Sequence, residues 1–247
     1  MNKLNFNLGG GATNRLKAFT LAEVLITLAI IGVVAALTIP TVVTSSRRTE
    51  IESRLKKSYA QLSQALQLAI KDYGSVAGWE FLTVTKNEEA NARFAKQYLT
   101  PYLKVAKDCT NNDSADCNYK YKNLRGAEID TGADGDYTFY LADGTYVAVN
   151  TFTIDNMMIF VDANGHKKPN IYGYDIQAYY IERGNKKSLN GSLATRDINF
   201  SNNSACAIGK NGTQCINLII QNGWKIPSKE EYVKFGGDAT KYPFNNL

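Results

Sequence analysis

One continuous apolar stretch, residues 19–43, constrains this chain of 247 residues more than any other feature. From residue 24 to residue 39 it contains no charged side chain, and only Thr27 and Thr38 are weakly polar. As a helix that rises ~1.5 Å per residue, the stretch reaches ~37 Å and exceeds the ~30 Å hydrocarbon core of a bilayer. The sequence therefore predicts a helix that crosses a membrane.

A lone carboxylate, Glu23, lies near the start of this stretch. A charged side chain in a membrane-spanning helix opposes insertion by ~2–3 kcal/mol. A secretory signal peptide does not fit, because its apolar core is only ~7–15 residues long and is cut at its far end. A plain single-pass anchor fits the hydropathy equally well but leaves Glu23 without an explanation. The position of Glu23 needs a further reason.

The residues around Glu23 supply one. Lys17-Ala18-Phe19-Thr20-Leu21-Ala22-Glu23, followed by the apolar run, resembles the processing site of type IV prepilins and pseudopilins. In that family the glutamate is fifth in the mature chain and a proline is twenty-second, and Glu23 and Pro40 match both positions when the chain is counted from Phe19. One departure is Ala18, which stands where the family usually has glycine. The resemblance is specific over residues 17–43.

The resemblance implies that prepilin peptidase, a membrane aspartic peptidase, cuts between Ala18 and Phe19 and methylates the new amine. Residues 1–18 are then a leader. Glu23 would pair with the α-amine of Phe19, its own or that of a neighbouring subunit. A neighbour's amine reaches Glu23 at only one axial stagger, so the pair would set the register of a filament. The alternative is a carboxylate that snorkels to the cytoplasmic headgroups.

Cysteine usage favours a compartment outside the cytoplasm, and the net charge gives no sign of a nucleic-acid partner. Removing the leader, whose charged residues are Lys3, Arg15 and Lys17, lowers the net charge from +5 to +2, too near neutral to argue for nucleic acid. The four cysteines form two close pairs in sequence, which suits an oxidising environment. Four cysteines allow three disulfide connectivities. The favoured one contains the two local disulfides, Cys109–Cys117 and Cys206–Cys215.

A zinc site is the rival interpretation of these cysteines, although their spacing lacks the short two-residue gap of zinc knuckles. Basic residues after the apolar stretch outnumber those of the leader and would favour the reverse orientation in the membrane. The expected disulfides and the family's mode of insertion place the large C-terminal part in the periplasm instead.

Helical periodicity continues beyond the apolar stretch without a turn signal. Apolar residues recur every three or four positions and line one face: Ile51, Leu55, Tyr59, Leu62, Leu66, Ala69, Ile70 and Tyr73. Gly74 then stands where a helix ends. The pattern predicts one helix from about Thr20 to about Tyr73, with Gly32 and Pro40 as its bending points.

Residues 87–98 and about 214–221 are expected to form shorter helices. Strand patterns follow at residues 137–141, 145–150, 156–161 and 175–181, and the first two flank Ala142-Asp143-Gly144, a hairpin signal. The expected fold is α+β and pilin-like, with the long helix packed on an antiparallel sheet of about four strands. The expected domains are the leader 1–18, the membrane and filament-core helix 19–43, and the head 44–247.

Asp162, Asn164 and position 166 have the one-three-five spacing with which a loop places oxygens around calcium, and Asp175 could close such a site. Some pseudopilins hold calcium in a comparable loop. His166 stands where an oxygen ligand is expected, however, and no glutamate closes the loop at position twelve. The alternative is a turn whose aspartate and asparagine side chains cap backbone amides.

The run Tyr119-Lys120-Tyr121-Lys122 has the residue types that stack on and neutralise single-stranded DNA, but such a run is more often a solvated loop or an edge strand. Nucleic acid is therefore not expected as a partner. No catalytic constellation is present: the single histidine has no cysteine or serine partner motif, and no glycine-rich phosphate loop occurs. The chain is not expected to be an enzyme.

The function that the resemblance implies is that of a filament subunit, a type IV pilin or a pseudopilin of a secretion or competence system. Its expected partners are prepilin peptidase, other pilin subunits and the bacterial inner membrane, and after assembly it would lie in a periplasmic or cell-surface filament. Two alternatives are a minor or tip pilin that binds a surface or DNA, and a membrane-anchored receptor domain.

Overall fold

The computed structural model describes residues 19–81, 87–110, 117, 120–130, 136–202 and 205–245. The expected leader, including Ala18, lies outside this part of the chain, as does Tyr119. The chain divides into two compact units, Met1–Val43 and Thr44–Leu247, which are described separately.

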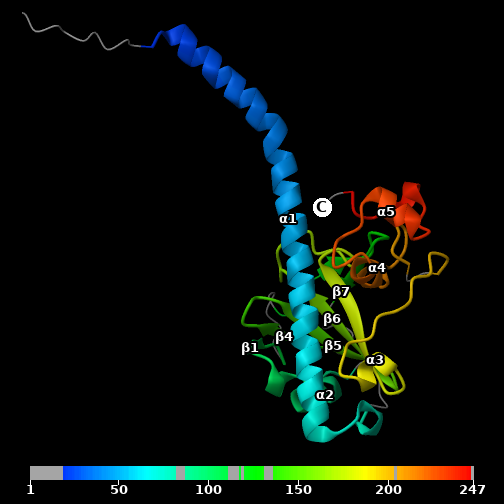
Figure 1. Cartoon of the computed structure of the whole chain (residues 1–247). Coiled ribbons are helices and arrows are strands. Elements are labelled where there is room, and N and C mark those ends of the chain that lie inside the picture. Colours follow the sequence, from blue (N-terminus) through cyan, green and yellow to red (C-terminus); the bar gives the residue numbers. More distant parts are fainter. Residues whose placement is uncertain are drawn as a thin grey trace, which may run out of the picture. The chain divides into compact units, whose positions relative to one another are not determined.

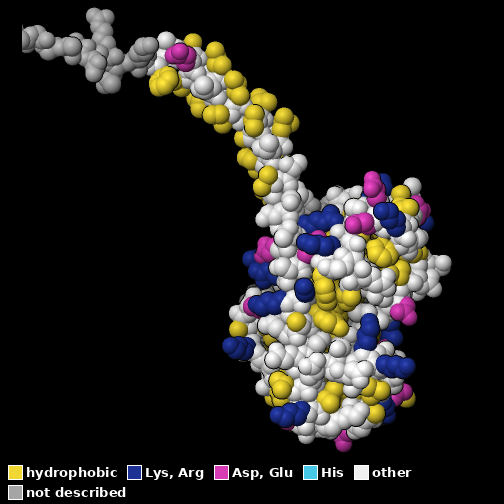
Figure 2. All heavy atoms as spheres, in the orientation of Figure 1, with side chains coloured by type: hydrophobic (Ala, Val, Ile, Leu, Met, Phe, Trp, Pro, Cys, Tyr) yellow, Lys and Arg dark blue, Asp and Glu magenta, His cyan; other side chains and the backbone are white. Residues whose placement is uncertain are grey.

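In the first unit, helix α1 (Leu21–Tyr73) begins and continues through Gly32 and Pro40. Its apolar side chains are exposed on all sides, and Figure 2 shows them along the visible face of this segment. By length and composition α1 is able to cross a membrane: its most apolar window has a mean hydropathy of 2.4, and none of that window is buried within the chain. This half of α1 needs an apolar surrounding that the described residues do not supply.

In the second unit, the remainder of α1 is amphipathic and lies across a sheet (Figure 1). The predicted stripe is largely confirmed, because Leu55, Leu62 and Leu66 are fully buried. Tyr73 departs from it, being 49% exposed at the end of the helix. Gly74 ends α1 with a φ of +78°, a conformation that glycine adopts without a Cβ clash, and its N–H donates to the carbonyl of Ile70.

The sheet has five antiparallel strands in the order β1-β4-β5-β6-β7. Their bounds are Val105–Asp108, Tyr137–Leu141, Tyr146–Thr153, Asn156–Asp162 and Ile176–Glu182. The predicted α+β pilin-like architecture is confirmed, and the four expected strands are β4 to β7. Strand β1 was not expected, because four residues at a sheet edge carry too little hydrophobic pattern to register as a strand.

Alternation along β6 gives the sheet two different faces. Met157, Ile159 and Val161 are fully buried in one core cluster with the stripe of α1. Met158 and Phe160 point to the opposite face and pack in a second cluster, which is rich in tyrosine. The face that α1 does not cover is thus covered by other segments of the head.

The other described elements complete the head. Helix α2 confirms the helix expected at residues 87–98 and is capped by the side chain of Asn87, which accepts from the N–H of Ala90 at 2.9 Å. Helix α4 confirms the one expected near residues 214–221. The elements outside the main sheet are η1 (Val76–Gly78), α2 (Glu88–Tyr98), η2 (Thr100–Tyr102), β2 (Lys120–Lys122), β3 (Glu128–Asp130), α3 (Lys186–Leu189), α4 (Cys215–Gln221), α5 (Lys229–Lys234) and η3 (Ala239–Lys241).

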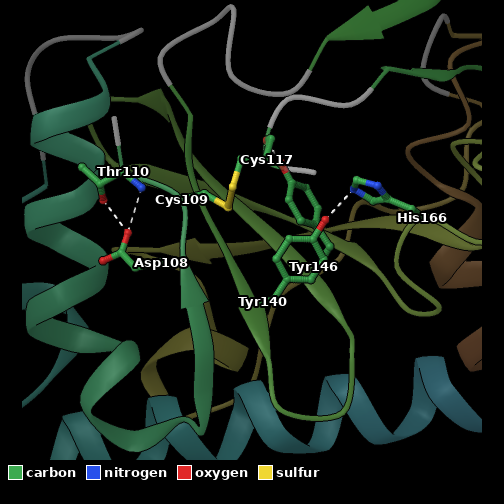
Figure 3. The surroundings of a disulfide bond; sticks show 7 residues. All are labelled: Asp108, Cys109, Thr110, Cys117, Tyr140, Tyr146 and His166. Carbon is green, nitrogen blue, oxygen red and sulfur yellow. Dashed lines mark hydrogen bonds between the residues drawn. A yellow bond between two sulfur atoms is a disulfide. The ribbon is translucent and has the colours of Figure 1, made fainter. Parts of the chain in front are cut away.

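Both favoured disulfides are present, Cys109–Cys117 and Cys206–Cys215, and no cysteine in the described residues is free. The zinc interpretation of these cysteines is therefore wrong. Figure 3 shows that Tyr146 lies beside the first disulfide, where its hydroxyl donates to the carbonyl of Cys117 at 2.9 Å.

The packing of α1 on the sheet gives a direct prediction for stability. Leu62→Ala removes a fully buried side chain, which costs ~2–5 kcal/mol, and should lower the melting temperature of the full-length protein by about 5–15 °C. Thermal unfolding followed by circular dichroism would measure this. Leu68→Ala is the matched control, because Leu68 is on the same helix but 39% exposed, and a comparable loss in both variants would contradict the packing.

Candidate functional site

The start of α1 is built around Glu23 and Thr20. The backbone N–H and the hydroxyl of Thr20 donate to the same carboxylate oxygen of Glu23, at 2.8 and 2.9 Å, and the N–H of Glu23 donates to the Thr20 hydroxyl at 3.2 Å. This reciprocal pair is a capping box, whose signature is Thr or Ser followed three residues later by Glu. The sequence carries that signature, Thr20 followed by Glu23, but an argument from the cost of a charge within the membrane does not reveal it.

The capping box places the carboxylate one helical turn from Phe19, which is 85% exposed. The hydroxyls farther along the apolar stretch are satisfied within the helix: Thr27 donates to the carbonyls of Glu23 and Val24, both at 2.9 Å, and Thr38 donates to that of Val34 at 2.9 Å. Glu23 is the only charged side chain between residues 19 and 43, and it lies at the end of the helix that processing would expose.

The bending roles of Gly32 and Pro40 stay predictions. A Cβ added at Gly32 would meet nothing within 4 Å, so no contact inside the chain requires glycine there. Pro40 lacks the N–H that would bond to the residue 36 carbonyl, which weakens the helix at that turn.

Two of the expected calcium ligands, the carboxylates of Asp162 and Asp175, are already engaged with backbone amides, whereas the side-chain oxygen of Asn164 is buried without a hydrogen-bond partner among the described residues. Asp175 is fully buried, and its two carboxylate oxygens accept from the N–H groups of Asn170 and Ile171 at 2.9 and 2.8 Å. Asp162, also buried, accepts from the N–H of Asn164 at 3.1 Å. These are the capping bonds of the Asx-turn alternative. No cluster of three or more His, Cys, Asp or Glu in the described residues is arranged to hold a metal.

Burial raises the pKa of the Asp175 carboxyl to about 6, because the surrounding protein disfavours its charged form more than the backbone hydrogen bonds of Ile171 and Asn170 favour it. Burial therefore disfavours the charged form of Asp175, which is the form that would bind calcium. The calcium site stays a prediction, and the geometry supports a structural role for the loop.

His166 does not complete this loop. Its ring nitrogen Nε2 is hydrogen-bonded to the hydroxyl of Tyr140, and the ring also lies beside Tyr146 (Figure 3). The residue at the fifth position of the calcium-like spacing therefore belongs to the aromatic group near the Cys109–Cys117 disulfide.

The described part of the tyrosine-lysine run, residues 120–122, presents no exposed aromatic ring. Lys120 and Lys122 are exposed on β2, but Tyr121 between them is buried and packs against Phe160 and Tyr172. The ring of Tyr121 is thus unavailable to a base.

One polar connection within the head is not foreseen by the sequence pattern. Glu52 on α1 is buried, with 6% of its surface exposed, and its carboxylate accepts from the N–H of Ile226 at 2.9 Å and from Lys225 at 3.2 Å. Arg48, one turn earlier on α1, donates to the carbonyls of Ile226 and Pro227. These bonds tie α1 to a segment more than 170 residues away, so periodicity along the helix carries no sign of them.

Two family models match the chain. One, described as Prokaryotic N-terminal methylation motif, matches residues 13–39. The other, described as Family of unknown function (DUF6613), matches residues 41–232, which is most of the chain. The chain belongs to this second family. Searches of curated proteins and of solved structures gave no match.

The methylation motif is the prepilin cleavage and methylation signal, so the resemblance seen at residues 17–43 is confirmed. The motif implies a pilin- or pseudopilin-type protein that prepilin peptidase processes, that is anchored in the inner membrane before assembly, and that assembles with pilin subunits. Proteins of this kind are typically not enzymes. The two matches meet at Pro40, which separates the motif from the family's own region.

Asp175 should make stability depend on pH. Because its folded pKa of about 6 lies above the ordinary 3.8, the folded chain holds a proton that the unfolded chain releases, and this contribution to stability is lost as pH rises through that window. At ~1.4 kcal/mol per pKa unit, the contribution is at most ~3 kcal/mol. Asp175→Asn should therefore become more stable relative to wild type by up to about that amount between about pH 4 and about pH 7.

Urea unfolding of both proteins at the two pH values, in chelator, would measure this difference. The exposed Asp155→Asn controls for the lost formal charge. A difference between wild type and Asp175→Asn that does not change with pH would show that the buried carboxyl does not titrate in this window.

The calcium loop has its own test. Calcium held by Asp162, Asn164 and Asp175 at a hundredfold excess over its dissociation constant would add ~2.7 kcal/mol of stability. Because these carboxylates already bind backbone amides, the melting temperature is expected to be the same in calcium and in chelator. A clear increase in calcium that Asp162→Asn abolishes would establish the site.

Proposed function

We propose that this protein is a structural subunit of a pilus-like or secretion filament. It is cut between Ala18 and Phe19, held in the inner membrane by residues 19–43, and polymerised with its head, residues 44–247, outside the cytoplasm. The observation that carries the proposal is the first half of α1, which is apolar on every side and preceded by a prepilin processing signal.

The apolar surface explains how one segment serves in two places. Lipid tails and packed apolar helices are similar environments for leucine, isoleucine and valine side chains, so transfer from bilayer to filament core costs little. Van der Waals packing and the few polar groups then decide which arrangement of helices forms. Glu23 is the one charged group available for that choice within residues 19–43.

Glu23 has different partners before and after cleavage. Before cleavage, its carboxylate is satisfied by the two donors of Thr20. Cleavage creates an α-amine at Phe19, and in an apolar surrounding a carboxylate and an ammonium group strongly favour each other over isolation. A neighbouring subunit's amine can reach Glu23 at one axial offset only, so the pair selects the register of the filament.

The test separates the charge of Glu23 from its cap. Glu23→Gln keeps an oxygen that accepts from Thr20 but removes the charge, whereas Thr20→Ala removes the hydroxyl and keeps the charge. Glu23→Gln should lower the amount of subunit in sheared filaments at least about tenfold, because an unpaired amine would remain in the apolar core. Thr20→Ala should lose much less.

Quantitative immunoblotting of filament and membrane fractions measures this effect, and intact-mass spectrometry confirms that each variant is cut before Phe19. Normal assembly of Glu23→Gln would remove the register role. A wild-type envelope protein that still carries residues 1–18 would instead favour a tethered receptor domain.

A further inference from the structure

A cavity of about 610 Å³ lies on the face of the sheet opposite α1. Its base is formed by β6 and β7, and its walls are formed by β2, β3 and residues from two stretches, 196–202 and 211–214. The volume is within the ~300–1,000 Å³ that small-molecule sites occupy. Its lining residues are Tyr121, Ile129, Met158, Phe160, Tyr172, Tyr180, Arg196, Asp197, Asn199, Asn202, Asn211, Thr213 and Gln214.

The wall of the cavity that contains residues 211–214 is held in place by covalent and close backbone contacts. The Cys206–Cys215 disulfide closes the segment that carries Asn211 and Gln214. Gly212 in that segment has a φ of +88°. It also lies so close to the loop before β7 that a Cβ atom at this position would be 2.9 Å from the carbonyl oxygen of Tyr172. The cavity is therefore a preformed feature of the head.

Two buried polar side chains in the lining have unused hydrogen-bonding capacity. Tyr172 is 2% exposed, and its hydroxyl has no hydrogen-bond partner among the described residues. Gln214 is 4% exposed, and its Oε1 accepts from the N–H of Asn199 at 2.8 Å, which fixes the amide and leaves its NH₂ group as a donor. The Tyr172 hydroxyl is closed off from solvent, so a ligand reaches it when a neighbouring side chain of the lining moves aside. A buried hydroxyl without a partner costs ~1–3 kcal/mol, and a ligand that satisfies it gains affinity.

The chemistry of the lining selects a neutral ligand with many hydroxyl groups. Arg196 is neutralised by Glu182 at 2.6 Å and stacks over Tyr180, so it is not free to attract an anion. Asp197, which is exposed at the rim of the cavity, would repel an anionic ligand. The remaining polar lining is almost entirely amide and hydroxyl, groups that both donate and accept as sugar hydroxyls do. The partly exposed Phe160 offers a ring face for the apolar side of a pyranose.

We propose that this cavity binds a single neutral saccharide ring, with Phe160 as its platform and Tyr172 and Gln214 as buried hydrogen-bonding partners. Because α1 covers the other face of the sheet, the site and the helix do not compete for the same surface. The proposal concerns the head alone and stands whether or not the subunit sets filament register through Glu23.

The experiment uses the full chain in lipid nanodiscs, because glycoside detergents would themselves occupy a sugar site. Ligand-observed NMR is recorded with neutral methyl glycosides of hexoses and N-acetylhexosamines, and with two counter-probes, a sialic acid glycoside and a tyrosine amide. Binding of a neutral glycoside is expected.

Two matched variants then locate the site. Tyr172→Phe should raise the Kd of the bound glycoside about tenfold, as the loss of one hydrogen bond does, without lowering the melting temperature. Tyr179→Phe is the control: Tyr179 is also a buried tyrosine of the sheet region without a hydrogen-bond partner in the described residues, but it packs against Tyr59 on the α1 face. Its removal should leave the Kd unchanged.

The proposal is overturned if no neutral glycoside binds, if only a counter-probe binds, or if the two variants change the Kd equally. A glycoside that binds with an affinity sensitive to Tyr172→Phe alone supports it.

Discussion

A single helix that must satisfy two surroundings is the constraint on which this structure depends. From Leu21 to Val43, α1 exposes apolar side chains in every direction, and from Ile51 onward it buries one stripe against a sheet. Backbone hydrogen bonding within a helix needs no outside partner, so the same secondary structure continues from lipid into the head. Only the distribution of apolar side chains around the helix changes. The head folds on the part of α1 that remains amphipathic.

The head secures α1 with both apolar and polar contacts. Leu55, Leu62 and Leu66 supply buried area against β6 and its neighbours, and Glu52 receives donors from the Lys225–Ile226 segment. A buried carboxylate is stabilising only when its partners are in place, so this contact specifies where the C-terminal segment lies more than it adds to stability. The apolar packing of α1 on the sheet therefore stabilises the head, whereas the polar contacts of α1 with residues 225–227 fix the position of that segment.

The two faces of the sheet are equally distinct. The face toward α1 is a dense apolar core, whereas the opposite face combines tyrosines, a disulfide-closed segment and a cavity rimmed with amides. The proposed filament role belongs to α1, and the proposed saccharide site belongs to the opposite face of the sheet.

What the sequence alone determined was local. The span of α1, its end at Gly74, the strands β4 to β7 and both disulfides follow from periodicity, turn residues and close cysteine spacing, signals that lie within a few residues of one another. Tertiary structure decided which polar side chains have partners. Glu52 is buried by a segment far along the chain, Tyr121 is covered by Phe160 and Tyr172, and Asp175 is occupied by the amides of its own turn. Burial and hydrogen bonding depend on contacts between distant segments, and a one-dimensional pattern does not contain those contacts.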